Sequence, residues 1–265
     1  MLGWLTDPFQ DAFMQRALAE VLVLGLACGP LGAWILLYRQ SYAAESISHG
    51  MLPGLVLAAL AGAPLVLGAA GGVLLASGAI SLAGRDARLG ADTGVAVAVS
   101  ALFGLGALLA LSPDAPPRLQ ELLFGDLLGA TGTDIAVASA LSVGIAIALG
   151  LAHRRLSLSA FDPGVARSLG TTPARWELVL LVLLALATMA AAPGLGSLLL
   201  VALVIAPGAA ALRLAGRLPA VLGLAAGLAA LAGAGGLLLS FHLGIAAGAA
   251  VALCAVALAG TAMLR

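Results

Sequence analysis

The sequence predicts an all-α protein that crosses a membrane about nine times. Of its 265 residues, 62% are hydrophobic and only 9% are charged, whereas soluble domains carry about a quarter charged residues. The core of a soluble fold of this length could not bury so much apolar surface. The 35 glycines suit helices that pack closely in lipid. The net charge of zero offers no basic face to a nucleic acid.

Uncharged stretches long enough to cross the hydrocarbon layer follow one another along the chain. In order, the predicted single spans and span pairs are Val21–Tyr38 (beginning near Phe13), Gly50–Gly84 (a pair beginning near Ala43), Thr93–Pro113, Ile135–Ala152, Leu178–Leu212 (a pair) and Leu218–Leu264 (a pair). Turn-forming residues divide the three pairs at Gly62–Pro64, at Ala192–Gly196 and between Gly235 and His242.

The arginines predict the orientation, since the chain has no lysine. If nine spans alternate, Arg16 and Arg118 fall on one side. The other side receives Arg39, Arg85, Arg88, Arg154, Arg155, Arg167, Arg175, Arg213, Arg217 and Arg265. Basic residues stay in the cytoplasm, so we expect the N-terminus outside and the C-terminus inside the cell.

We expect a single membrane domain over residues 1–265, with one longer cytoplasmic loop over residues 153–177. The centre of this loop predicts a short helix, because Asp162 is a good N-cap, Pro163 suits the first helical position and Gly170 can end the helix. So short a helix is not stable alone in water. It either packs on the protein's own loops at the membrane surface or docks a cytoplasmic partner.

The chain has no means of hydrolysing ATP through a P-loop, whose lysine contacts the phosphates, because it contains no lysine. We therefore expect no enzymatic activity of its own. If the chain is a transporter, its energy must come from an ion gradient or from a separate ATPase subunit.

Two ionisable residues, Glu45 and His49, begin the second predicted span. Four residues apart, they share one face of a helix. Ionisable groups at membrane depth usually face the protein interior or a pathway, and a carboxylate with an imidazole is a partial site for Zn²⁺, Mn²⁺ or Fe²⁺. A hydrogen-bonded pair that anchors the helix end is the simpler alternative. His242, at the outer junction of the last two spans, is a weaker ligand candidate.

At these residues the sequence resembles the metal-ion ABC permeases, which import zinc, manganese and iron. The run LLYRQSYAAESISHGMLPGLVLA is similar to the family's carboxylate-and-histidine signature, and FDPGVARSLGTTPARW to the coupling helix that meets the ATPase subunit. LLFGDLLG resembles an outer-loop motif of the family. Two more apolar runs, GSLLLVALVIAPGAAALRLAG and GGLLLSFHLGIAAGAA, resemble its late helices. The resemblance extends from about Phe13 to Gly260.

The resemblance implies a homodimer in the cell (inner) membrane, with two cytoplasmic ATPase subunits that bind ATP and an extracytoplasmic protein that delivers the metal. The metal is transported rather than kept as a cofactor. Glu45 and His49 would contact or gate the ion. The residues implied in ATPase coupling are Asp162, Pro163, Ala166, Arg167, Ser168 and Gly170.

This chain departs from the family at three positions. Glu45 replaces the usual Asp, Gln40 replaces an often basic residue, and His242 stands where an aromatic is common. The first change can alter coordination distance or metal preference, and the last can add a ligand.

Four other functions remain open at this stage. A permease for vitamin B12 or siderophores has a similar loop helix, although a bulky chelate needs no direct Glu–His ligands. A proton-driven secondary transporter would use the pair as a relay and would need no ATPase. An intramembrane enzyme lacks a credible catalytic set, and an assembly scaffold would show no metal dependence.

Overall fold

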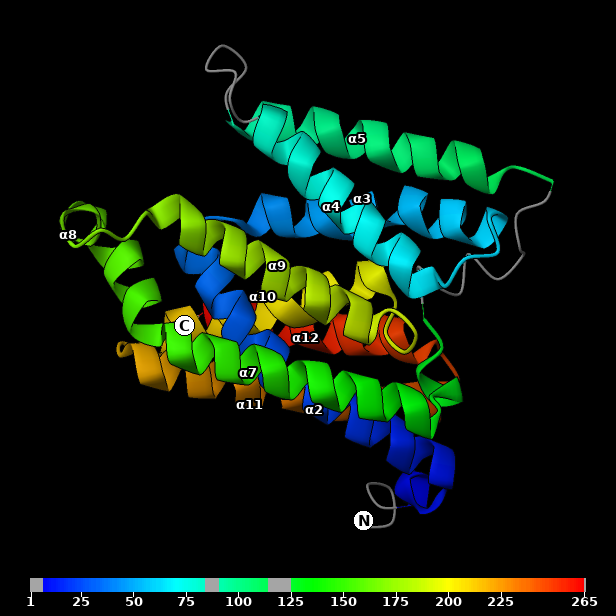
Figure 1. The fold of residues 1–265 in the computed structure, drawn as a ribbon. Helices are drawn as coiled ribbons and strands as arrows, with labels where there is room; N and C mark the ends of the chain where they lie inside the picture. The colour runs from blue at the N-terminus through cyan, green and yellow to red at the C-terminus, as the bar shows by residue number, and fades with distance from the viewer. Residues whose placement is uncertain (1–6, 84–90, 114–124, 265) are drawn as a thin grey trace.

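The computed structural model describes residues 7–83, 91–113 and 125–264, and these residues form helices and turns (Figure 1). Two short 3-10 helices are η1 (Asp7–Gln10) and η2 (Leu127–Gly129). The α-helices are α2 (Ala12–Leu37), α3 (Ser41–Leu60), α4 (Leu65–Ala83), α5 (Ala91–Ala110), α7 (Gly132–Phe161), α8 (Pro163–Ser168), α9 (Pro173–Ala191), α10 (Ser197–Leu214), α11 (Leu218–Leu243) and α12 (Ala247–Met263). The all-helical prediction is confirmed.

All the helices in the described part except α8, η1 and η2 have 17 residues or more. Each of these long helices overlaps one of the predicted spans. Five of them, α2, α5, α7, α9 and α11, are long and apolar enough to cross a membrane on length and composition alone. In the other four, α3, α4, α10 and α12, the apolar stretches within the described residues are 10–17 residues long.

Two predicted boundaries were wrong. The segment from His153 to Phe161 was expected to be loop, but it forms the last turns of α7. The last two spans were expected to divide between Gly235 and His242, but α11 continues to Leu243 and ends at Gly244, whose φ is +65°. Gly236 is a packing residue instead, because a Cβ there would lie 2.5 Å from the backbone nitrogen of Val251 in α12.

Helix α2 is the centre of the fold and packs against α7, α9, α10 and α11. Glycine permits this close approach. A Cβ on Gly29 would lie 2.8 Å from the backbone nitrogen of Ala226 in α11, and one on Gly32 would lie 2.6 Å from the carbonyl carbon of Val204 in α10. Backbone therefore meets backbone on two sides of α2, as small residues allow in membrane helices.

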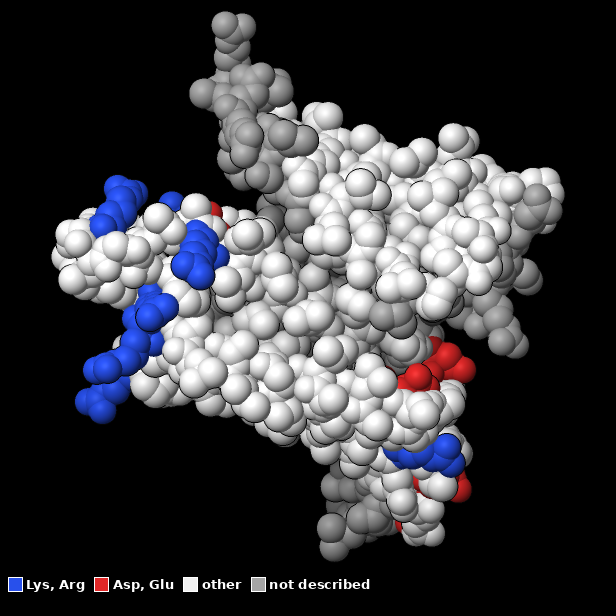
Figure 2. Space-filling view, viewed as in Figure 1, with Lys and Arg blue, Asp and Glu red and all other residues white. Residues whose placement is uncertain are grey.

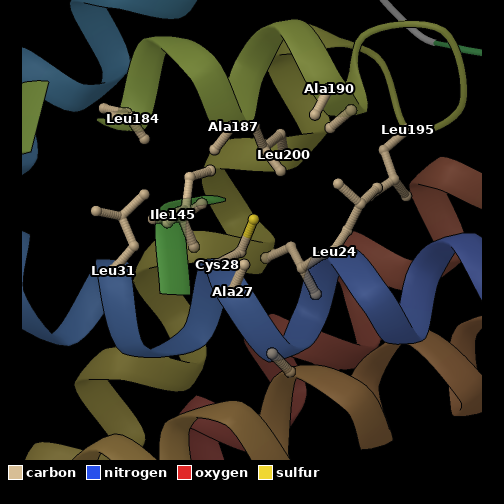
Figure 3. Close-up of a cluster of buried hydrophobic side chains, with 14 of the residues drawn as sticks. Leu24, Ala27, Cys28, Leu31, Ile145, Leu184, Ala187, Ala190, Leu195 and Leu200 are labelled. Atoms are coloured by element: carbon tan, nitrogen blue, oxygen red, sulfur yellow. The ribbon is translucent and has the colours of Figure 1, made fainter. Parts of the chain in front are cut away.

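The buried side chains between α2, α7, α9 and α10 form the main core (Figure 3). The residues labelled in that view are Leu24, Ala27, Cys28, Leu31, Ile145, Leu184, Ala187, Ala190, Leu195 and Leu200. They are small or aliphatic, which suits dense packing in an apolar solvent.

Helices α3, α4 and α5 form a second group beside this core (Figure 1). Within it, a Cβ on Gly54 of α3 would lie 2.7 Å from Gly72 Cα of α4. Helix α3 also contacts α9 and α10. Helix α4 contacts α9 as well. Helix α3, which carries the Glu45–His49 pair, is thus one of two helices that join the groups.

Candidate metal pathway and coupling segment

Glu45 and His49 lie in the first turns of α3, on one face of the helix as predicted. His49 Nε2 is 4.0 Å from Glu45 Oε1. The Glu45 side chain is 60% exposed and that of His49 is 24% exposed. The other ring nitrogen of His49, Nδ1, is buried and has no hydrogen-bond partner in the part of the chain that the structure describes. The pair therefore presents a carboxylate to open space and an imidazole that is only partly covered.

The open space is a cavity of about 540 Å³ between α3, α10 and α12. Besides the pair, its lining includes Ser41 and Tyr42 of α3 and apolar side chains of α10. A smaller cavity of about 140 Å³ lies on the α5 side of the same two residues. The His49 ring also packs edge-on against Phe103 of α5, with the ring centroids 5.1 Å apart.

Two side chains do not complete a metal site. Among the described residues, no three histidines, cysteines or acidic residues come together in a way that could hold a metal ion. Ser41 and Tyr42 also line the cavity, and a hydroxyl group is a weaker oxygen ligand than a carboxylate. An ion held by Glu45 and His49 would need water or another chain to fill its coordination shell.

The structure does not bring His242 to this pair. His242 is exposed at the end of α11, where its ring packs edge-on against Phe241 at 5.4 Å between centroids. The pair lies where α3 begins, and α3 and α11 start at the same end of the bundle (Figure 1). His242 and the Glu45–His49 pair therefore lie at opposite ends.

The predicted short helix is present as α8, and its ends are built as the sequence indicated. Asp162 Oδ1 accepts a hydrogen bond from the Val165 backbone N–H at 2.9 Å, and Pro163 is the first helical residue. At the other end Gly170 has φ +74°. The N–H of Gly170 donates to Arg167 O and that of Thr171 to Ala166 O, at 3.0 and 2.8 Å. This is the hydrogen-bond pattern of a Schellman cap.

Helix α8 projects from the end of the bundle (Figure 1) and packs against α7 and α9. Ala166 is the one described residue of Phe161–Gly170 that is buried; the others, including Arg167 and Ser168, are exposed. Sequence reasoning missed the apolar members of this exposed set. Phe161, Val165 and Leu169 are 65%, 44% and 67% exposed. Val165 and the C-cap residue Leu169 are four residues apart and lie on one side of α8, whereas Phe161 is the last residue of α7 and is separated from α8 by the non-helical Asp162.

Most described arginines gather at the end of the bundle that carries α8, while one lies at the other end near acidic side chains (Figure 2). By their places in the helices, the arginines at the α8 end are Arg39, Arg154, Arg155, Arg167, Arg175, Arg213 and Arg217. Arg16, near the start of α2, lies at the opposite end.

The described part of the LLFGDLLG motif, from Gly125 onward, packs on the turn between α9 and α10; its residues up to Phe124 lie outside the described part of the chain. The Asp126 backbone N–H donates to Pro193 O at 2.9 Å, and Asp126 Oδ1 accepts from Gly129 N–H at 3.1 Å. A Cβ on Gly125 would overlap the backbone of Gly194 to Gly196. The motif therefore fixes a loop against the residues that divide the sixth and seventh predicted spans.

Known proteins resemble this chain over nearly its whole length. The model of the ABC 3 transport family matches residues 10–265. The chain is 32% identical to a probable iron transport system membrane protein of Haemophilus influenzae, over 96% of this chain and 93% of that protein. It is 31% identical to the chelated iron transport system membrane protein YfeD of Yersinia pestis (94% and 84% covered). It is 32% identical to the manganese import system permease protein ScaB of Streptococcus parasanguinis (92% and 87% covered).

Solved structures are similar in fold. A chain of PsaBC from Streptococcus pneumoniae, solved in complex with Fab, matches with a TM-score of 0.89 and 28% identity, over 99% of this chain and 95% of that one. An inward-facing putative metal-chelate type ABC transporter matches with a TM-score of 0.73 over 94% of this chain and 85% of that one. At 16% identity, the second match supports the fold alone.

Proposed function

The chain belongs to the ABC 3 transport family and is a membrane transport protein; on this premise we propose that it is the permease subunit of an ATP-driven importer of divalent transition-metal ions, Mn²⁺, Fe²⁺ or Zn²⁺. The observation that carries the proposal is the Glu45–His49 pair, which lines a cavity of about 540 Å³ at the start of α3. Carboxylate and imidazole suit all three ions. The names of the iron and manganese relatives agree with this class of cargo.

An incomplete ligand set suits a permease better than a storage or catalytic site. A transported ion must bind well enough to enter and weakly enough to leave. The 60% exposure of the Glu45 side chain leaves room for water or for ligands of a second chain. We propose that the permease is a homodimer in which two such pairs face one pathway.

The energy source in this proposal is a separate pair of ATPase subunits that docks on α8. Four exposed side chains of this segment support the docking role: Phe161, Val165, Arg167 and Leu169. Three of them are large and apolar, and a partner that covered them would remove this apolar surface from water. Movement of α8 on ATP binding would reorient the spans. An extracytoplasmic binding protein would deliver the ion at the opposite end.

The membrane topology in this proposal has nine spans, with the N-terminus outside and the C-terminus in the cytoplasm. The gathering of arginines at the α8 end supports this direction (Figure 2), because basic residues stay on the cytoplasmic side.

A permease for a metal chelate is the second candidate. It is favoured by the name of YfeD, a chelated iron transport system membrane protein. The Glu45–His49 pair favours the free ion over the chelate, because a chelated metal already has its ligands.

Uptake by proteoliposomes tests the proposal. The permease is reconstituted with its candidate ATPase and binding protein, and Mn²⁺, Fe²⁺ and Zn²⁺ are offered separately with and without ATP. We expect ATP-dependent uptake of at least one ion, abolished by Glu45→Gln and by His49→Ala. His242→Ala is the matched control, because it removes a histidine that lies away from the cavity, and it should retain uptake.

The other outcomes separate the alternatives. Uptake that needs no ATP would indicate a secondary transporter. Uptake of a chelate but of no free ion would favour the second candidate. Variants of the pair that transport as well as wild type would contradict the assignment of the pathway.

A further inference from the structure

Glu20 is a buried carboxyl group that the proposed transport cycle leaves unused. It lies in α2, about 12 Å along the helix axis from the first residue, and its exposed fraction is 0%. Neither Oε1 nor Oε2 has a hydrogen-bond partner among the described residues. An unpaired ionised carboxylate in an apolar interior is so unfavourable that such groups become neutral instead.

The turn between α9 and α10 covers this carboxyl group. A Cβ on Gly194 would lie 2.9 Å from Glu20 Cδ and 3.1 Å from Oε2. Glycine at this position therefore lets the turn rest directly on the carboxyl group. The same turn accepts the hydrogen bond from Asp126 N–H through Pro193 O, so Glu20 lies beneath the junction of the Gly125–Gly129 loop and the turn.

Among the described residues, the charged and titratable groups at this end of the neighbouring elements are Asp7 of η1, Asp11 and Arg16 at the start of α2, Asp126 beside η2, Asp134 of α7 and His242 of α11. Of these, Asp134 acts electrostatically on Glu20, and its charge has the same sign. Arg16 lies one turn before Glu20 but is exposed, and no described arginine lies within 4.0 Å of the Glu20 carboxylate. Burial of the unpartnered carboxyl group therefore opposes a negative charge at Glu20, and the like charge of Asp134 acts in the same sense.

A metal ion does not fit here. Glu20 lines neither of the cavities beside Glu45 and His49. A metal–oxygen bond needs about 2.0–2.6 Å of free space next to the oxygen, and the Gly194 backbone occupies that side. A proton needs no cavity, because it bonds to the oxygen already present.

We propose that Glu20 is a proton-binding site whose occupancy is linked to the packing of the α9–α10 turn. While the turn covers the carboxyl group, Glu20 is the neutral acid. When the turn lifts, water reaches the group, the O–H bond breaks, and the proton passes to the solvent at that end, leaving a hydrated carboxylate. The solvent is extracellular if the topology of the proposed function is right, and only the transport arm of the test rests on that function.

Infrared spectroscopy of the purified chain in nanodiscs tests the site without any transport assay. At pH 7 an exposed glutamate is ionised, whereas a buried neutral Glu20 gives the C=O stretching band of a carboxylic acid. We expect this band in the wild type and its complete loss in Glu20→Gln, which has the shape of the neutral acid and should fold. A wild-type spectrum at pH 7 whose carboxylic-acid region matches that of Glu20→Gln overturns the site.

A glycine substitution tests the link to the turn. Gly194→Ala places a methyl group against the carboxyl group, so the turn should lift and the band should be lost although Glu20 is present. Gly144→Ala is the matched control, because a Cβ at Gly144 meets nothing within 4 Å; it should keep the band. A folded Gly194→Ala variant that keeps the band overturns the link.

Proteoliposome uptake tests the direction. Acid on the binding-protein side should slow uptake by the wild type by holding the turn closed, and Glu20→Gln should lose this dependence. A dependence that is the same in both proteins overturns the link to transport, while the infrared band still reports on the site itself.

Discussion

The N-cap of α8 offers a quantitative test of how the coupling segment is held. Helix α8 has only six residues, and Asp162 Oδ1 accepts the Val165 N–H at 2.9 Å. Replacing an N-cap Asp by Ala costs about 1 kcal/mol, which changes the ratio of closed to open α8 by about fivefold. The Asp162→Ala variant should therefore open α8 about five times as often as the wild type.

Hydrogen exchange measures this opening directly. The amides of Gly170 and Thr171 are bonded only while α8 is formed, at 3.0 and 2.8 Å. In a peptide covering residues 162–172, we expect both to exchange about fivefold faster in Asp162→Ala under conditions in which exchange follows the open population. The Asp162→Ala variant should also bind the ATPase subunit more weakly, because a smaller fraction of the molecules has α8 formed.

Asp162→Asn is the control for charge. Asn caps a helix about as well as Asp, so this variant should exchange at close to the wild-type rate. Equal acceleration in the Ala and Asn variants would mean that the charge, rather than the cap, stabilises α8. Unchanged exchange in Asp162→Ala would refute the reasoning, since α8 would then be held by its packing alone.

Three further outcomes follow from the packing. Gly29→Ala should lower stability by about 1–3 kcal/mol through backbone overlap with α11, seen as earlier thermal unfolding, whereas Gly227→Ala, whose Cβ meets nothing within 4 Å, should not. Gly170→Val should lower the stability of the α8 end by roughly 1–2 kcal/mol, because Gly170 has φ +74°, and should uncouple ATPase activity from transport. Gly170→Asn should be tolerated, because Asn adopts this backbone conformation more readily. Leu169→Glu should weaken ATPase binding without unfolding the permease, since the side chain is 67% exposed; wild-type affinity would exclude it from the docking surface.

Local signals were sufficient to predict the parts of the structure that depend on neighbouring residues. The cap at Asp162 and the left-handed Gly170 are properties of a few consecutive residues, and the structure has both. Glu45 and His49 share a face because helix geometry places residues four apart together. The break at Ala192–Gly196 was predicted because proline and glycine interrupt helices.

Features that depend on distant packing could not be predicted in this way. Glu20 merely marked the edge of the uncharged stretch beginning at Val21, and nothing in the sequence indicated that Gly194 covers its carboxyl group. The sequence predicted a turn near Gly236 because glycine is common in turns. Its close approach to Val251 of α12, which explains the glycine, cannot be read from the sequence. The position of Phe103 beside His49 likewise requires knowing how α5 packs on α3.

The end of α7 was misplaced for a different reason. A span was expected to end where the lipid ends, at Ala152, but a helix can continue into water when its residues find partners. Leu156 and Ser159 are buried, and the Leu156 backbone carbonyl accepts a hydrogen bond from Tyr38 Oη at 3.0 Å. These contacts with α2 extend α7 to Phe161.

Helix α7 is continuous over 30 residues, so its length determines how far α8 lies from the start of α7. It is about 45 Å long, about 15 Å more than the hydrocarbon layer of about 30 Å, and α8 follows one of its ends. The other end is fixed by the capping box of Thr131 and Asp134. Inserting one residue between these two ends would rotate α8 by about 100° and advance it by about 1.5 Å. Substitutions at exposed positions of α7 therefore leave α8 in place, whereas an insertion or a deletion in α7 would rotate and shift α8.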